Sequence, residues 1–178
     1  DLLRALEGRA LKQELLDPLD DAEQPRWYHE IAQLIIELIT LMVDSALKDD
    51  DKCSVFHFSS EISEAQSASG AQRQALATLI RRGAELSHES TDMSGALNRG
   101  LATLKRDSDR PSALMLFTDG MPDKGTESRV LESARRCAEA SVPVHVCAFG
   151  DQLSLDFLNE ISAITGGNIT LGRNLEQL

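Results

Sequence analysis

The strongest constraint on the fold is an apolar run that ends in a polar turn. Residues 113–117 read Ala-Leu-Met-Leu-Phe, and Thr118, Asp119 and Gly120 follow directly. The run is too short for an independent helix, so it predicts a strand buried on both faces, as in a parallel sheet. Ligands of open α/β sheets bind beyond the carboxyl ends of the strands, which makes Asp119 a candidate functional carboxylate. The alternative is that Asp119 only caps a turn, as aspartate before glycine often does.

Segments with strand and helix patterns alternate along the rest of the chain. Strands are predicted over residues 53–59, 61–65, 113–117, 142–149 and 168–171. Helices are predicted over residues 1–16, 26–47, 70–86, 94–105, 126–141 and 154–165. This order implies right-handed crossovers and a doubly wound, mostly parallel α/β sheet with helices on both faces. We interpret residues 1–178 as one domain, with an N-terminal helix and loop at 1–25 and a core at 26–178.

The charge of the chain narrows the classes of partner. Aspartate and glutamate number 29 against 18 lysines and arginines, which gives a net charge of -11. An acidic chain repels phosphate, so neither nucleic acid nor an anionic membrane surface is an expected partner. No apolar run approaches the roughly 20 residues that a membrane-spanning helix needs.

The cysteines indicate a reducing compartment. Cys53, Cys137 and Cys147 are an odd number without metal-ligand spacing, and two of them fall in apolar runs with strand character. This predicts free, buried thiols in a cytoplasmic protein. A catalytic thiol would need a positioned base, and nothing in the pattern places His57 or His145 beside one. We therefore do not expect an enzyme.

Two loops carry the polar residues that the predicted topology brings to the ligand-binding edge of the sheet. Residues 90–97 read Ser-Thr-Asp-Met-Ser-Gly-Ala-Leu, and residues 117–123 read Phe-Thr-Asp-Gly-Met-Pro-Asp. A threonine hydroxyl and an aspartate carboxylate are hard oxygen donors, and these suit Mg²⁺, which keeps several waters and takes few protein ligands. Taken alone, Thr91 reads better as an ordinary helix cap.

In this order, the motifs resemble the von Willebrand factor A domain family, over about residues 26–178. The shared features are the long first helix, the strand ending Phe-His-Phe-Ser, the Thr-Asp-Met-Ser-Gly-Ala-Leu turn, the strand into Thr-Asp-Gly-Met-Pro, the strand Val-His-Val-Cys-Ala-Phe-Gly and the closing Ile-Thr-Gly-Gly. The resemblance implies a protein–protein interaction module. It also implies that Thr91 and Asp119 match the threonine and aspartate of the family's metal-ion-dependent adhesion site, which typically holds Mg²⁺. A protein partner would complete the metal's shell with an acidic side chain, and Asp92, Met121 and Asp123 would border that partner.

One motif of the family is missing. The first strand of the family ends in Asp-x-Ser-x-Ser, and the nearest segment in place here is residues 17–21, Asp-Pro-Leu-Asp-Asp. Asp17 could stand for the aspartate as a further metal ligand, but Leu19 and Asp21 replace both serines. The preceding residues make a poor buried strand because polar residues interrupt them. Either the true first strand lies upstream of Asp1, or the site is degenerate and the domain binds partners without metal.

Two other classes of function stay open at this point. One is a metal-independent structural or scaffolding domain of a larger protein. The other is a Mg²⁺-dependent phosphotransfer or hydrolase enzyme that uses Asp119 at a strand end. Such an enzyme would also need a second acid near the first strand and a lysine at another strand end, and neither can be placed in the sequence.

Overall fold

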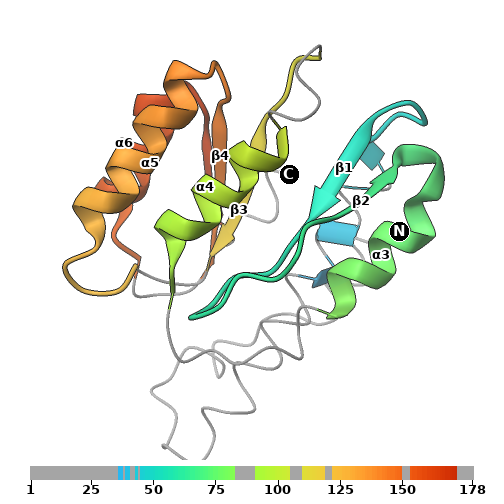
Figure 1. Ribbon diagram of the computed structural model, residues 1–178, viewed down its shortest axis with the longest axis horizontal. Coiled ribbons are helices and arrows are strands. Elements are labelled where there is room, and N and C mark those ends of the chain that lie inside the picture. The colour runs from blue at the N-terminus through green and yellow to red at the C-terminus, as the bar shows by residue number, and fades with distance from the viewer. Residues whose placement is uncertain are drawn as a thin grey trace, which may run out of the picture.

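The fold contains a parallel sheet, an antiparallel hairpin and the helices that pack on them (Figure 1). The computed structural model describes residues 36–37, 39–40, 43, 45–82, 91–104, 110–118, 122–149 and 153–171. The elements are β1 (Lys52–Val55), β2 (Gln66–Ser69), the 3-10 helix η2 (Gly70–Gln72), α3 (Arg73–Arg82), α4 (Met93–Leu104), β3 (Leu114–Thr118), α5 (Glu127–Glu139), β4 (Val144–Ala148), α6 (Leu155–Thr165) and β5 (Ile169–Leu171). The helix predicted over residues 1–16 lies outside the described residues. All described positions of the helix predicted over 26–47 are helical except the last, Leu47.

The three parallel strands are ordered β3-β4-β5. Leu114 lies opposite Val144 and Thr118 opposite Ala148, while Val146 lies opposite Ile169. The predicted α/β fold class with a parallel sheet is therefore confirmed. Each strand is reached through a helix, because parallel neighbours need a long crossover connection.

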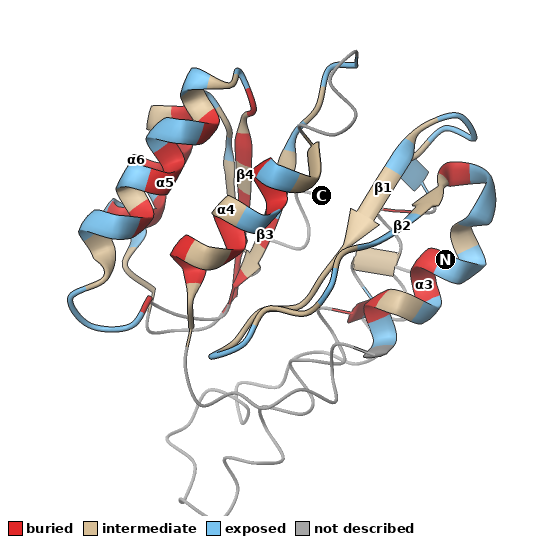
Figure 2. Ribbon diagram, viewed as in Figure 1, coloured by how far each residue is buried: buried red, intermediate tan, exposed pale blue. Residues whose placement is uncertain are grey.

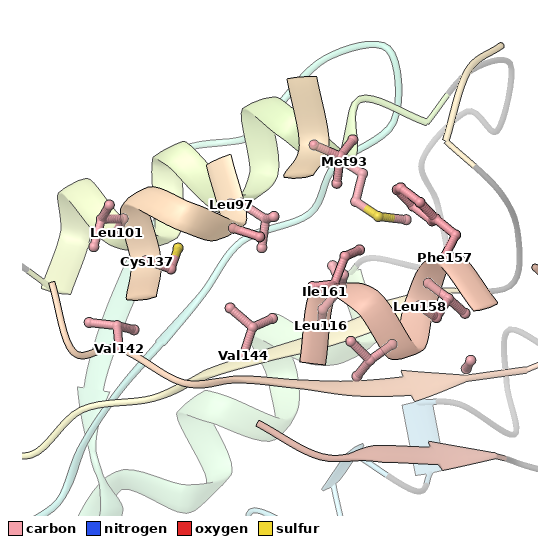
Figure 3. Close-up of a cluster of buried hydrophobic side chains, with 14 residues drawn as sticks. Met93, Leu97, Leu101, Leu116, Cys137, Val142, Val144, Phe157, Leu158 and Ile161 are labelled. Atoms are coloured by element: carbon pink, nitrogen blue, oxygen red, sulfur yellow. The ribbon is translucent and has the colours of Figure 1, made fainter. Parts of the chain in front are cut away.

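The main hydrophobic core lies between this sheet and helices α4, α5 and α6. Figure 3 shows side chains of all three helices over the same face of β3 and β4. Leu97, Val130, Val144, Leu158 and Ile161 belong to this core, and each exposes 2% or less of its surface. Figure 2 shows the opposite, outward faces of the helices as exposed. Apart from the exposed Leu155 at the start of α6, the apolar positions at helical spacing face this core.

Strand β3 differs from the prediction of burial on both faces. Leu116 is buried against the helices, but Met115, which points to the opposite face of the sheet, is 48% exposed. The described helices around β3 cover one face only, so alternate side chains have different surroundings. Among the described strands β4 is the middle one and β3 lies at an edge, although the apolar run of β3 predicted a strand buried on both faces.

The hairpin β1–β2 corrects two predicted boundaries. The strand predicted over 53–59 ends at Val55, and the strand predicted over 61–65 is replaced by an isolated bridge between Phe58 and Ile62. The second strand forms later, at Gln66–Ser69. Phe58 packs against the main core, and the His57 N–H donates to Ser63 Oγ at 2.8 Å, so this segment turns away from the hairpin ladder.

All three cysteines are free thiols, as predicted. Burial raises the pKa of the Cys53 and Cys147 thiols above the ordinary value of 9.0. The neutral thiol is favoured in the native state, so the unfolded chain ionises first and stability is lost as the pH rises above about 9. Urea denaturation at pH 8 and pH 10 should show a smaller loss of unfolding free energy in the Cys53→Ala/Cys147→Ala variant than in the wild type. The packing lost in the variant is common to both pH values, so equal losses would contradict the prediction.

Candidate functional site

Three loop segments meet at the carboxyl edge of the parallel sheet. We call residues 58–63, 91–92 and 122–126 the loop cluster. At this edge the Phe149 N–H donates to the Thr118 carbonyl at 2.9 Å, so the pairing of β3 and β4 continues to the last residue of β3. The Asp92 N–H donates to the Ser59 carbonyl at 3.0 Å, which ties the segment after β1 to the start of α4.

Thr91 and Asp123 join two loops that are 32 residues apart in the sequence. The Thr91 N–H donates to Asp123 Oδ1 at 3.1 Å. The Asp123 carbonyl in turn accepts the Thr126 N–H at 3.0 Å and the Thr126 hydroxyl at 2.6 Å. Asp123 therefore orders the loop before α5 and also holds that loop against the start of α4.

Asp92 is the N-cap of α4. Its Oδ1 accepts the Gly95 N–H at 2.9 Å, and its carbonyl accepts the Ala96 N–H at 3.1 Å. Such a cap satisfies a backbone donor that the first turn of a helix leaves unpaired. A Cβ on Gly95 would lie 2.2 Å from Asp92 Oδ2 and 2.5 Å from Ile62 Cδ1, so glycine allows the cap and the loop to approach. Thr91 and Asp92 are both of the residue types favoured at helix N-caps, and the structure gives this role to Asp92.

The structure brings together part of the predicted site. Thr91, Asp92 and Asp123 all lie in the loop cluster, whereas Asp17, Asp119 and Met121 lie outside the described residues. No group of three or more His, Cys, Asp or Glu side chains within the described part of the chain is arranged to hold a metal ion. The donors that are present fit Mg²⁺ in kind, because a hydroxyl and carboxylates are the hard oxygens that this ion prefers.

A polar pocket between α4 and α5 was not predicted. It has a volume of about 320 Å³, and Ser94, Asn98, Arg129, Ser133 and Arg136 are among the residues that line it. The signal in the sequence is helical spacing: Ser94 and Asn98 lie four residues apart, and Arg129, Ser133 and Arg136 follow at intervals of four and three. That spacing shows that the residues share a face, but not that the two faces meet.

The described residues define an α/β domain with a parallel sheet, and loops at its carboxyl edge carry the side chains of Thr91, Asp92 and Asp123. The family model of the von Willebrand factor type A domain matches residues 21–171, so the chain belongs to this family. None of its described helices is long and apolar enough to cross a bilayer.

Solved structures of low sequence identity share the fold. The von Willebrand factor type A protein from Catenulispora acidiphila is 15% identical, with a TM-score of 0.70, and the match covers 80% of this chain and 34% of that one. An aerotolerance-related membrane protein from Bacteroides fragilis is 15% identical, with a TM-score of 0.66, and the match covers 80% and 81%. The TFIIH p34 N-terminal domain is 16% identical, with a TM-score of 0.58, and the match covers 83% and 86%. No curated protein matches the chain.

Proposed function

We propose that this domain binds a protein partner through the loop cluster, with Mg²⁺ held by Thr91, Asp119 and Asp17. Domains of the von Willebrand factor type A family commonly mediate protein–protein interactions. The observation that carries the proposal is the hydrogen bond from the Thr91 N–H to Asp123 Oδ1, which fixes one predicted ligand beside the loop that follows β3. Both segments lie at the edge where α/β sheets bind their ligands.

The residues around Thr91 support a preorganised site. Asp123 holds the Thr91 backbone, and the Asp92 cap holds the first turn of α4 directly after it. A site whose ligands are fixed by neighbouring hydrogen bonds loses less entropy when it binds. When bound, the ion would supply a Lewis-acidic position for a carboxylate oxygen of the partner. Asp92, Met121 and Asp123 would border that partner.

Thermal melts with Mg²⁺ or with a chelator test the metal. An ion that binds only the native state stabilises it by about 2.7 kcal/mol when its concentration is 100 times the dissociation constant. We expect the two melts to separate for the wild type and to coincide for Asp119→Ala. Asp50→Ala is the matched control: Asp50 is an exposed aspartate before β1, outside the loop cluster, and this variant should keep the separation.

The metal-independent alternative is supported by the hydrogen bonds of the two described aspartates. Asp92 and Asp123 each use a carboxylate oxygen to bind a backbone N–H, so both have a structural role without any ion. Wild-type melts that coincide with and without Mg²⁺ would contradict the metal site. The loop cluster would then be a binding surface made by the protein alone.

A further inference from the structure

The pocket between α4 and α5 has a floor of hydroxyl groups. Ser94 Oγ and Ser133 Oγ lie 3.0 Å apart, and Asn98 Nδ2 donates to Ser133 Oγ at 3.1 Å. Ser133 Oγ also donates to the Arg129 carbonyl at 3.0 Å. Ser94 contacts Arg129, and Asn98, four residues later, contacts Ser133, which is four residues after Arg129. The two helices therefore run parallel in a defined register.

The hydrogen-bonded serines at the floor of the pocket, which we call the polar seam, are deeply buried. Ser133 is 2% exposed and Ser94 is 6% exposed, although the same helices bury Leu97, Val130 and Ala134 in the main core nearby. Burying hydroxyls is unfavourable unless each is hydrogen-bonded, and apolar side chains would pack the helices without that requirement. These hydroxyl groups give the pocket of about 320 Å³ a polar floor that hydrogen bonds hold in place.

The rim of the pocket is cationic on an otherwise acidic protein. Arg129 and Arg136 line it, against one acid, Glu132. Arg136 lies 3.4 Å from Glu132, and Arg135, which does not line the pocket, reaches the same glutamate from 4.0 Å. Arg129 forms no ion pair with any residue that the structure describes. Its guanidinium is a planar fork of donors suited to carboxylates and phosphates.

We propose that the α4–α5 pocket binds an oxyanion, a carboxylate or phosphate group, through Arg129 at its rim and the Asn98 amide at its floor. The Asn98 amide uses one N–H for Ser133, which leaves a second donor on the same nitrogen. A volume of about 320 Å³ suits a small ligand or one side chain. This site is built from helix faces and does not depend on the metal proposed at the loop cluster.

Isothermal titration calorimetry at fixed ionic strength tests the site with three probes. These are inorganic phosphate, citrate and the blocked tripeptide acetyl-Gly-Glu-Gly-amide. We expect saturable binding to the wild type that Arg129→Gln weakens by about tenfold or more, the effect of losing one hydrogen-bonded charge. Arg135→Gln, on the same helix but outside the pocket, should bind like the wild type. Both side chains are exposed, so these changes should leave the fold intact.

The three probes also distinguish the possible sources of the oxyanion. Binding of phosphate or citrate identifies a free small anion, and binding of the peptide alone identifies an acidic side chain of a protein. If Arg129→Gln does not fold, Arg129→Lys, which keeps the charge and loses the planar fork of donors, gives the same comparison. The proposal is overturned if none of the probes binds saturably, or if the Arg129 variant binds as tightly as Arg135→Gln.

Discussion

Replacing Leu158 with alanine is expected to lower the free energy of unfolding by about 3–4 kcal/mol, within the range for leucines truncated in protein cores. Leu158 is 1% exposed and lies in the main core between α6 and the sheet (Figure 3). The substitution removes buried methyl groups and leaves a cavity that close-packed neighbours fill only in part. Urea denaturation followed by circular dichroism measures the loss.

Leu155→Ala is the matched control for this change. Leu155 lies one turn earlier on the same helix and is 42% exposed, so its truncation leaves no enclosed cavity. Alanine and leucine are both strong helix formers, so the difference between the two variants mainly reports burial. We expect the control to change stability by less than about 1 kcal/mol. Equal losses at the two positions would mean that α6 does not pack on the sheet as described.

Gly167→Ala is expected to destabilise the domain by at least about 3 kcal/mol, the upper end of the usual effect of overpacking. A Cβ on Gly167 would lie 1.9 Å from the carbonyl oxygen of Val144 and 3.1 Å from the backbone nitrogen of His145. The obstacle is the backbone of the central strand β4, which cannot move away as a flexible side chain would. Relief would require α6 and β5 to separate from β4.

The variant Gly166→Ala is the control that distinguishes a steric clash with β4 from strain of the backbone. Gly166 ends α6 with a φ of 73°, and nothing lies within 4 Å of the position that its Cβ would take. Only the left-handed conformation opposes alanine there, which costs about 1–2 kcal/mol. Thermal or urea unfolding of both variants should therefore rank Gly167→Ala as the more damaging. The reverse order would show that the chain after α6 does not approach β4 so closely.

The sequence predicted helices and buried strands more reliably than the surroundings of each strand face. Leu155, Leu158 and Ile161 repeat at helical spacing, and Gly166 ends the helix as expected. The run at 113–117 could not show that Met115 faces away from the helices, because a continuous apolar run has no period to distinguish the two faces. Phenylalanine favours strands, but Phe58 packs against the main core and lies outside the hairpin strands, so tertiary packing overrides this local preference.

For the candidate site, the sequence predicted that the loops carrying Thr91 and Asp123 meet, while metal binding and partner contact stay predictions. The rule that ligands gather at carboxyl ends of parallel strands brought Thr91 and Asp123 to one edge, and the structure places them within hydrogen-bonding distance. It did not decide which of Thr91 and Asp92 caps α4, and it did not show that the Asp123 side chain joins the two loops. Contacts between Arg129 and Ser94 depend on the register of two helices, which no pattern within one helix specifies.

The described core is in two parts, and this division affects how the domain opens. A small cluster of Ile36, Val43, Leu76 and Ile80 lies under the hairpin, apart from the larger core under the parallel sheet. Cooperative units with fewer buried apolar contacts open at lower free energy, so the hairpin and α3 can loosen while the sheet persists. The bond from Asp92 to Ser59 crosses between these parts at the loop cluster. A partner bound at the loop cluster, as proposed, would contact both parts and would therefore restrict the motion of the hairpin as well as of the sheet.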